Sequence, residues 1–284
     1  MDAAASVSTL RAALEPRLEP AARTWLAASI DRVTTAPDPD ALLIAYAGAT
    51  RRLGRDALGT EGGRCLGEVP LGHWGVDEVG RALLLLAVRE AVPDGERYAQ
   101  LVRRCYDEGT AREQQSWLRG LAILPESERF VEIATDACRT NVVPLFESIA
   151  CENPYPARHF PERAFNQLVL KSLFNGIALA RIVGLTDRLN PELSRMANDY
   201  VSEREAAGRT VPADIWVVVA PHVAAPGLER ALQYLGHDDP DHRYWAAVAL
   251  RGRAGGADAL ARRRDVEPDP RVLAALDGVP ADPS

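Results

Sequence analysis

The sequence predicts an all-α fold, a HEAT-like helical repeat array (an α-solenoid) of about a dozen short antiparallel helices. Apolar residues recur at spacings of three and four, as in Leu42 and Tyr46 and again in Val79, Leu83 and Leu86, which is the period of an amphipathic helix. The alternating pattern of a half-buried strand is almost absent. Short helices in series are expected to stack, because none can bury its apolar stripe alone.

Proline and glycine breaks divide the chain into these helices. We expect one α-helical domain over residues 1–253, with a HEAT-like helix pair at 228–251. Residues 254–284, rich in Arg, Asp and Pro, are expected to form a C-terminal helix and a frayed tail. The breaks fall at Pro37, Pro39, 93–95, Pro125, Pro144, 153–161, Pro191, Pro212, Pro226 and 238–240.

A glycine-rich segment interrupts the helical pattern at residues 53–75. Seven of the 21 glycines of the chain lie in it, and its helical signal is weak. The segment predicts a long loop, either a mobile lid or a plain surface insertion. Its glycines do not have the GxGxxG or GxxxxGK[ST] spacing of a phosphate-binding loop.

The charge balance argues against a nucleic acid or an anionic membrane as the main partner. The chain of 284 residues has 33 basic and 40 acidic side chains, a net charge of −7, and no basic stretch. The first residues lack a basic start followed by an apolar block, and the longest apolar run, 82–88, is too short to cross a bilayer. We therefore expect a cytoplasmic protein that does not span a membrane.

The cysteines and histidines do not indicate a metal site. The four cysteines include no CxxC pair, and no Cys/His cluster has a zinc-site spacing. Only His237 and His242 approach a ligand spacing, and the acids between them are more simply interpreted as helix caps and solvated charges. We expect no metal and no cofactor.

The first candidate site is a polar stripe on the helix that Pro161 opens. At about 100° per residue, Asn166, Gln167, Lys171 and Phe174 share one face, and the other faces are apolar. Such a stripe needs polar partners inside the protein or in a cavity. It forms either a pocket wall or a structural network in which Lys171, the sole lysine, pairs with a carboxylate and the two amides tie down the NPYP turn at 153–156.

The second candidate is the helix expected over residues 190–208. Met196, Asp199, Tyr200, Glu203 and Ala207 share one of its faces. Two carboxylates one turn apart can raise each other's pKa and act as acid and base. They can equally pair with neighbouring cations, for which the sequence offers Arg195, Arg204 and Lys171.

These stretches carry a resemblance to a known family. The chain resembles the EboA family, a cytoplasmic "metabolite traffic" protein of bacterial operons that also encode a UbiA-type prenyltransferase-like membrane protein. The chain departs from the family pattern at Phe165, where the family has Trp, and at Ala206, where it has an aromatic residue. The matching motifs are HWGVD at 73–77, NPYPA at 153–157, FNQLVLK at 165–171, and AGR at 207–209 with Trp216.

The resemblance implies a helical, HEAT-like protein that helps to move or process a secondary-metabolite precursor, prenylated or aromatic, and it implies no catalytic residues. Its implied partners are the small metabolite, the UbiA-type membrane protein and other proteins of the operon. Our leading hypothesis is a non-enzymatic carrier or scaffold with a pocket between helices. The residues expected to line that pocket are Trp74, Tyr155, Asn166, Gln167, Lys171, Phe174 and Tyr200.

Two other functions are kept as alternatives. One is a cofactor-independent cyclase, isomerase or lyase of secondary metabolism, in which Lys171, Asp199 and Glu203 act as acids and bases. The other is a protein-interaction scaffold without a pocket, which would present an exposed apolar or charged concave surface.

Overall fold

The structure, a computed structural model, describes residues 3–35, 37–59, 65–222, 225–253 and 255–278. Within these ranges the chain forms sixteen α-helices, seven 3-10 helices and two strands of two residues each. The prediction of an all-α fold is confirmed. The helices outnumber the dozen expected, because the chain also breaks at 15–19, 108–110 and 265–269 and forms a short helix, Tyr155–His159, within the break expected at 153–161. The solenoid arrangement stays a prediction.

The chain divides into two compact units, residues 1–161 (unit 1) and 162–284 (unit 2). Each unit has its own buried apolar core. The single domain expected over residues 1–253 stays a prediction.

Unit 1 consists of helices and one small hairpin. Its elements are α1 (Ala3–Leu14), η1 (Glu15–Arg17), α2 (Pro20–Thr35), α3 (Pro39–Leu53), β1 (Cys65–Leu66), β2 (Val69–Pro70), η2 (Leu71–His73), α4 (Val76–Ala91), α5 (Gly95–Asp107), α6 (Ala111–Gly120), η3 (Leu121–Ile123), η4 (Ser127–Phe130), α7 (Val131–Ala137), α8 (Val143–Ala150) and α9 (Tyr155–His159).

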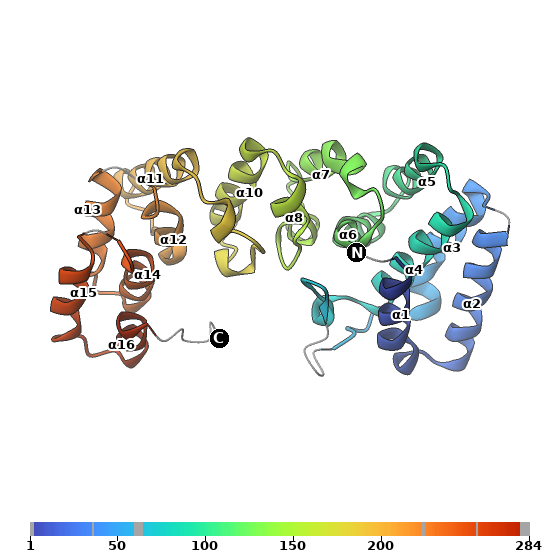
Figure 1. Ribbon diagram of the computed structural model, residues 1–284, viewed down its shortest axis with the longest axis horizontal. Helices are drawn as coiled ribbons and strands as arrows, with labels where there is room; N and C mark the ends of the chain where they lie inside the picture. The colour runs from blue at the N-terminus through green and yellow to red at the C-terminus, as the bar shows by residue number, and fades with distance from the viewer. Residues whose placement is uncertain (1–2, 36, 60–64, 223–224, 254, 279–284) are drawn as a thin grey trace. The chain divides into compact units, whose positions relative to one another are not determined.

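Helix α4 is the centre of unit 1. It packs against α1, α2, α3 and α6, and every residue from 76 to 88 is buried (Figure 1). Its apolar residues surround the helix axis, which is the pattern of a helix covered on all sides. Glu78 reaches back to accept a hydrogen bond from the amide of Gly75, 2.7 Å away, and so caps the start of the helix.

A buried charge cluster joins α4 to α3 and α6. The carboxylate of Asp77 accepts hydrogen bonds from Arg81 at 2.8 Å, from Arg112 at 2.6 and 3.1 Å, and from Thr50 at 2.7 Å. Arg81 also donates to Thr50 and to Ser116. Burial opposes ionisation of Asp77, but these bonds outweigh it and lower its pKa. The cluster is fully bonded, which is the condition for a buried charge to stabilise a fold.

The described part of the glycine-rich segment packs closely against the rest of unit 1. Strands β1 and β2 pair in antiparallel register, and a bridge joins Ala57 to Gly75. Arg17 donates two hydrogen bonds to the carbonyl of Leu58. The segment also buries Leu66, Val69, Leu71 and Trp74. Residues 60–64 of the expected loop lie outside the described residues, and a lid role stays a prediction.

Unit 2 consists of seven α-helices with 3-10 helices between them. Its elements are α10 (Glu162–Phe174), η5 (Leu179–Arg181), η6 (Thr186–Arg188), α11 (Pro191–Ala206), η7 (Ala213–Ile215), α12 (Trp216–Val219), α13 (Ala225–Tyr234), α14 (Pro240–Leu250), α15 (Ala257–Arg264) and α16 (Pro270–Asp277).

Helix α14 is the centre of unit 2. It packs against η7, α12, α13 and α16, and Figure 1 shows the last four helices side by side. Helices α13 and α14 form the pair expected at 228–251, while its HEAT-like character stays a prediction. One C-terminal helix was expected after residue 253, but two, α15 and α16, are present, because the sequence EPDP at 267–270 ends one helix and caps the next. Residues 279–284 of the expected tail lie outside the described part.

A buried ion pair fixes α14 beside the turn between α15 and α16. Arg243 of α14 donates to both carboxylate oxygens of Glu267, at 2.9 and 2.8 Å. Glu267 also accepts from Arg263 at 2.6 Å and from the amide of Asp269 at 3.0 Å. Burial opposes the charge on Glu267, but these donors outweigh it and lower its pKa to about 2.

Replacing Asp77 by alanine should strongly destabilise unit 1. Arg81 would remain buried without its carboxylate partner, which costs about 3–5 kcal/mol of unfolding free energy. The matched control is Asp199→Ala, which breaks the ion pair with Arg195 on an exposed helix face and should leave the unfolding midpoint in place. Urea unfolding followed by circular dichroism compares the two variants. Equal midpoints for both would contradict a stabilising role of the cluster.

The Arg243–Glu267 pair predicts a specific pH dependence of stability. The folded pKa of Glu267 lies below its ordinary value of 4.5, so its contribution is complete above about pH 4.5 and is lost as the pH falls towards about 2. The variant Glu267→Gln should therefore be less stable than the parent chain at pH 6. Urea midpoints measured at pH 6, 5, 4 and 3 should show this difference shrinking below about pH 4.5. A constant difference would argue against the pair.

Candidate functional site

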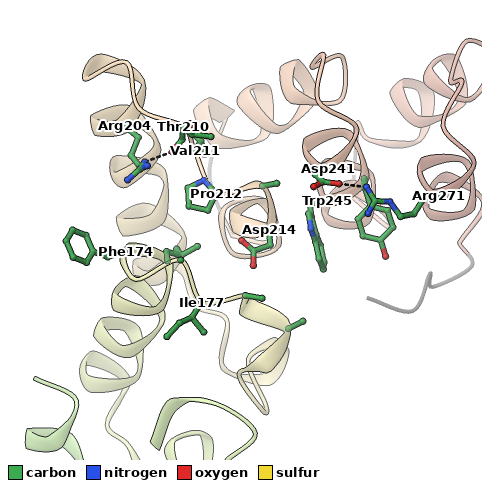
Figure 2. A pocket seen from close by; sticks show the side chains of 16 residues that line it. Phe174, Ile177, Arg204, Thr210, Val211, Pro212, Asp214, Asp241, Trp245 and Arg271 are labelled. Carbon is green, nitrogen blue, oxygen red and sulfur yellow. Dashed lines mark hydrogen bonds and ion pairs between the residues drawn. The ribbon is translucent and has the colours of Figure 1, made fainter. Parts of the chain in front are cut away.

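A groove in unit 2 is the candidate site. Its volume of about 600 Å³ lies within the range typical of small-molecule pockets. Apolar side chains form most of its walls, and a few charged groups lie among them (Figure 2). The lining residues are Leu173, Phe174, Gly176, Ile177, Ala178, Ala180, Arg204, Thr210, Val211, Pro212, Ala213, Asp214, Asp241, Tyr244, Trp245 and Arg271.

Two glycine-terminated helices build the first wall. Helix α10 ends in a Schellman motif: Gly176 has φ 71°, and the amide of Ile177 donates to the carbonyl of Ser172 at 2.9 Å. Helix α11 ends in the same way, with Gly208 at φ 62° and the amide of Arg209 on the carbonyl of Arg204 at 2.8 Å. The left-handed conformation at both positions favours glycine, and it turns the segments 177–180 and 210–214 into the groove.

Asp214 lies at the centre of the groove. Figure 2 shows its carboxylate between Pro212 and Ile177 on one side and Trp245 on the other. The carboxylate accepts a hydrogen bond from the amide of Leu179 at 2.7 Å, which holds η5 against η7. Burial raises the pKa of Asp214, and no cationic side chain of the described residues forms an ion pair with it.

Aromatic residues of α14 form the opposite wall. The rings of Tyr244 and Trp245 meet edge to face, with centroids 5.0 Å apart. The guanidinium of Arg271, from α16, lies 5.6 Å from the centroid of the Tyr244 ring and pairs with Asp241. Asp241 is thus neutralised by a cation of the same wall, whereas Asp214 is not.

Arg204 lies on the first wall. Its Nε donates to the carbonyl of Thr210 at 2.5 Å, and its Nη1 donates to the hydroxyl of Tyr200 at 3.2 Å. Both of these acceptors are neutral oxygen atoms. Tyr200, one of the residues expected to bind ligand, contacts the groove only through Arg204.

The polar stripe predicted on α10 divides among different environments. Asn166 is buried and exchanges hydrogen bonds of 2.9 and 3.2 Å with Asn190, so it ties α10 to the first turn of α11. Gln167 is exposed, and Lys171 is half-buried outside the groove lining. Phe174 does line the groove, but it is 73% exposed and its ring turns away from Ile177 (Figure 2). Ligand binding by these four residues stays a prediction.

Trp74 and Tyr155 both lie in the core of unit 1. Trp74 is 1% exposed. The hydroxyl of Tyr155 donates to the carbonyl of Ser127 at 2.7 Å, and its ring meets Phe160 edge to face. These contacts are those of packed core residues. The ligand role predicted for the two aromatics stays a prediction.

The acids of the second candidate site lie on the surface of α11. Asp199 pairs with Arg195 at 2.6 Å on an exposed face, and Glu203 is also exposed. Neither lines the groove. The pairing with a flanking arginine that the sequence offered as an alternative is present for Asp199.

The two clustered histidines contact aromatic rings. His237 and His242 have ring centroids 4.5 Å apart, and Nδ1 of His242 accepts a hydrogen bond from the indole of Trp216 at 3.2 Å. Within the ranges that the structure describes, no group of three or more His, Cys, Asp or Glu side chains is placed to hold a metal ion.

Asp214, Trp245 and Arg271 are groove residues that the sequence did not reveal. Asp214 comes two residues after a helix-opening proline and has the pattern of an ordinary acidic residue in a first helical turn. Trp245 and Arg271 lie on different short helices, and no periodicity connects them. Of the groove lining, the sequence predicts Phe174 as a candidate ligand contact, Arg204 as a partner for the acids of α11, and Pro212 as a helix break.

Replacing Asp214 by asparagine should leave the fold intact and its stability equal to that of the parent chain or higher. The asparagine side-chain oxygen can still accept the hydrogen bond from Leu179, while the cost of a buried, unpaired charge is removed. We expect the free energy of unfolding at pH 7 to change by less than about 1 kcal/mol in the destabilising direction. Thermal and urea unfolding test this, and a loss above about 2 kcal/mol would show that the charge itself supports the fold.

Comparison with known proteins places the chain in a family. The family model described as "Metabolite traffic protein EboA" matches residues 6–220. No curated protein and no solved structure matches the chain. Among the helices of the described residues, none has the length and apolar character needed to cross a bilayer. The matched residues cover most of the sequence, and the chain belongs to the EboA family.

Proposed function

We propose that this protein binds a small metabolite in the groove of unit 2 and carries it without changing it chemically. The observation that supports this most is the groove itself, which combines apolar walls with the central carboxylate of Asp214. This mixture of apolar surface and a few placed polar groups is typical of ligand sites. The family description, metabolite traffic, agrees with such a role.

The cargo that we propose is a precursor in secondary metabolism, prenylated or aromatic, which the protein carries in the cytoplasm. Aromatic groups on α14 suit such a body, because rings and isoprenoid chains gain most from apolar contact. A UbiA-type membrane protein and other proteins of the same operon are the partners to which cargo would pass.

An acid–base enzyme is the second candidate, and one observation favours it. A carboxyl group whose pKa is raised by burial inside a cleft has the property expected of a general acid or base. Asp214 would then take the role that the sequence suggested for Lys171, Asp199 and Glu203.

Native mass spectrometry of the protein purified from its own host tests both functions. We expect a stoichiometric small-molecule adduct, to be released by denaturation and identified. A released compound that the host also contains in the absence of this protein supports a carrier, and a compound that is present only when the protein is present supports an enzyme. A clean mass together with a co-purifying protein would contradict both and favour an interaction scaffold.

Replacing Trp245 by alanine should weaken retention of the adduct by at least about tenfold, because the ligand loses its largest aromatic contact. The matched control is Trp25→Ala, which truncates a half-buried tryptophan of α2 in unit 1 and should leave retention unchanged. Adduct occupancy in native mass spectra measures both. Equal retention in the two variants would overturn the groove as the site.

The variant Lys171→Ala separates the groove from the polar stripe of α10. A site restricted to the groove lining predicts that the adduct is retained, since Lys171 does not line it. A site that includes the stripe predicts that the adduct is lost while the protein stays folded. Circular dichroism confirms folding in either case.

A further inference from the structure

Two charged side chains of the groove, Asp214 and Arg204, have no ion-pair partner among the described residues, and Asp214 is the one whose pKa burial shifts. The charged side chains of its walls are Arg204 from α11, Asp214 from η7, Asp241 from α14 and Arg271 from α16. Arg271 pairs with Asp241, and Arg204 donates hydrogen bonds to a carbonyl and a hydroxyl oxygen. Asp214 receives backbone hydrogen bonds from Leu179 and from its own amide, and no ion pair within the described part.

A half-buried carboxylate in this position is costly in the empty protein. Withdrawing a charge from water without a partner is unfavourable, and part of that cost is visible in the raised pKa of Asp214. A ligand that brings a positive charge supplies the Coulombic partner that Asp214 lacks in the described part of the chain, and this attraction offsets part of the cost of withdrawing the two charges from water. A cationic group also forms the stronger kind of hydrogen bond, because its donor is charged.

The apolar walls indicate what the cation is attached to. Ile177 and Val211 lie on the side of α10 and α11, and Trp245 and Tyr244 lie on the side of α14. A ring or hydrocarbon body placed against Trp245 gains apolar contact, and a cation near that indole gains a further electrostatic attraction to its face.

We propose that the groove selects metabolites that carry a protonated amine on an apolar, aromatic or isoprenoid body, with the ammonium group paired to Asp214. This inference rests on the proposed function, since it names the ligand class of the same groove. It assigns the specificity for the head group to Asp214 and the affinity for the body to the α14 wall.

Three probes that share one ring system test the proposal: naphthylmethylamine, naphthylmethanol and naphthylacetate. Binding to the full chain at pH 7 is measured by titration followed by nuclear magnetic resonance. The amine should bind about tenfold more tightly than the alcohol, which is the factor given by one charge-assisted pair of about 1.4 kcal/mol. The acetate should bind more weakly than either, because its charge repels Asp214.

The variant Asp214→Asn should reduce the preference for the amine over the alcohol to less than about twofold, while binding of the alcohol is retained. The matched control is Asp277→Asn, which removes an exposed carboxylate of α16 that pairs with Arg264 outside the groove and should keep the tenfold preference. Lowering the pH of the parent chain from 7 towards 4 should weaken binding of the amine alone, because protonation of Asp214 removes its charge.

The outcomes separate this inference from the proposed function. Equal binding of all three probes, lost in Trp245→Ala, would overturn the amine preference and leave the groove as a binding site. Tightest binding of the acetate would also overturn it and would point to Arg204 as the head-group partner. An amine preference that persists in Asp214→Asn would overturn the role of that carboxylate. Failure of every probe to bind would count against both.

Discussion

The buried ion pair between Arg243 and Glu267 is the interaction on which the rest of unit 2 depends. Charges withdrawn from water stabilise a fold only when their hydrogen bonds are complete, and Glu267 accepts from two arginines and one backbone amide. The pair fixes α14 beside α16, which is why Trp245 and Arg271, from different helices, line the same groove. The aromatic wall of the site is thus a consequence of a contact made on the buried side of α14.

The opposite wall depends on backbone geometry. Helices α10 and α11 both end at a left-handed glycine, and the segments that follow meet where Asp214 accepts the amide of Leu179. This hydrogen bond holds the wall together and also places a charge in the groove without a cation from the described residues. Asp214 therefore holds the wall together and also carries a charge that has no ion-pair partner among the described residues. A fold retains such a charge more readily where a bound ligand supplies the partner.

Local patterns predicted the helices well and the site only in part. The three-to-four spacing of apolar residues identifies α3 and α4, and the prolines mark where α10 and α11 begin. The shared face of Asn166, Lys171 and Phe174 did not become one wall, because Asn166 turns to Asn190 and Phe174 lies at the rim. A helical period fixes the direction of a side chain but not the element that packs against it.

The sequence by itself determined that the chain is helical, where most of its helices end, and to which family it belongs, because these follow from local periodicity, helix-ending residues and short motifs. Only the tertiary structure decided which charges are paired. Asp77 and Asp199 each pair with an arginine four residues away, yet one pair is buried in a complete network and the other is exposed to water. Asp214 lacks such a cation among the described residues, because packing between segments far apart in the chain sets its surroundings. Whether a charge is buried, and whether a cation lies beside it, depends on how segments far apart in the chain pack together. A local sequence pattern does not contain that information.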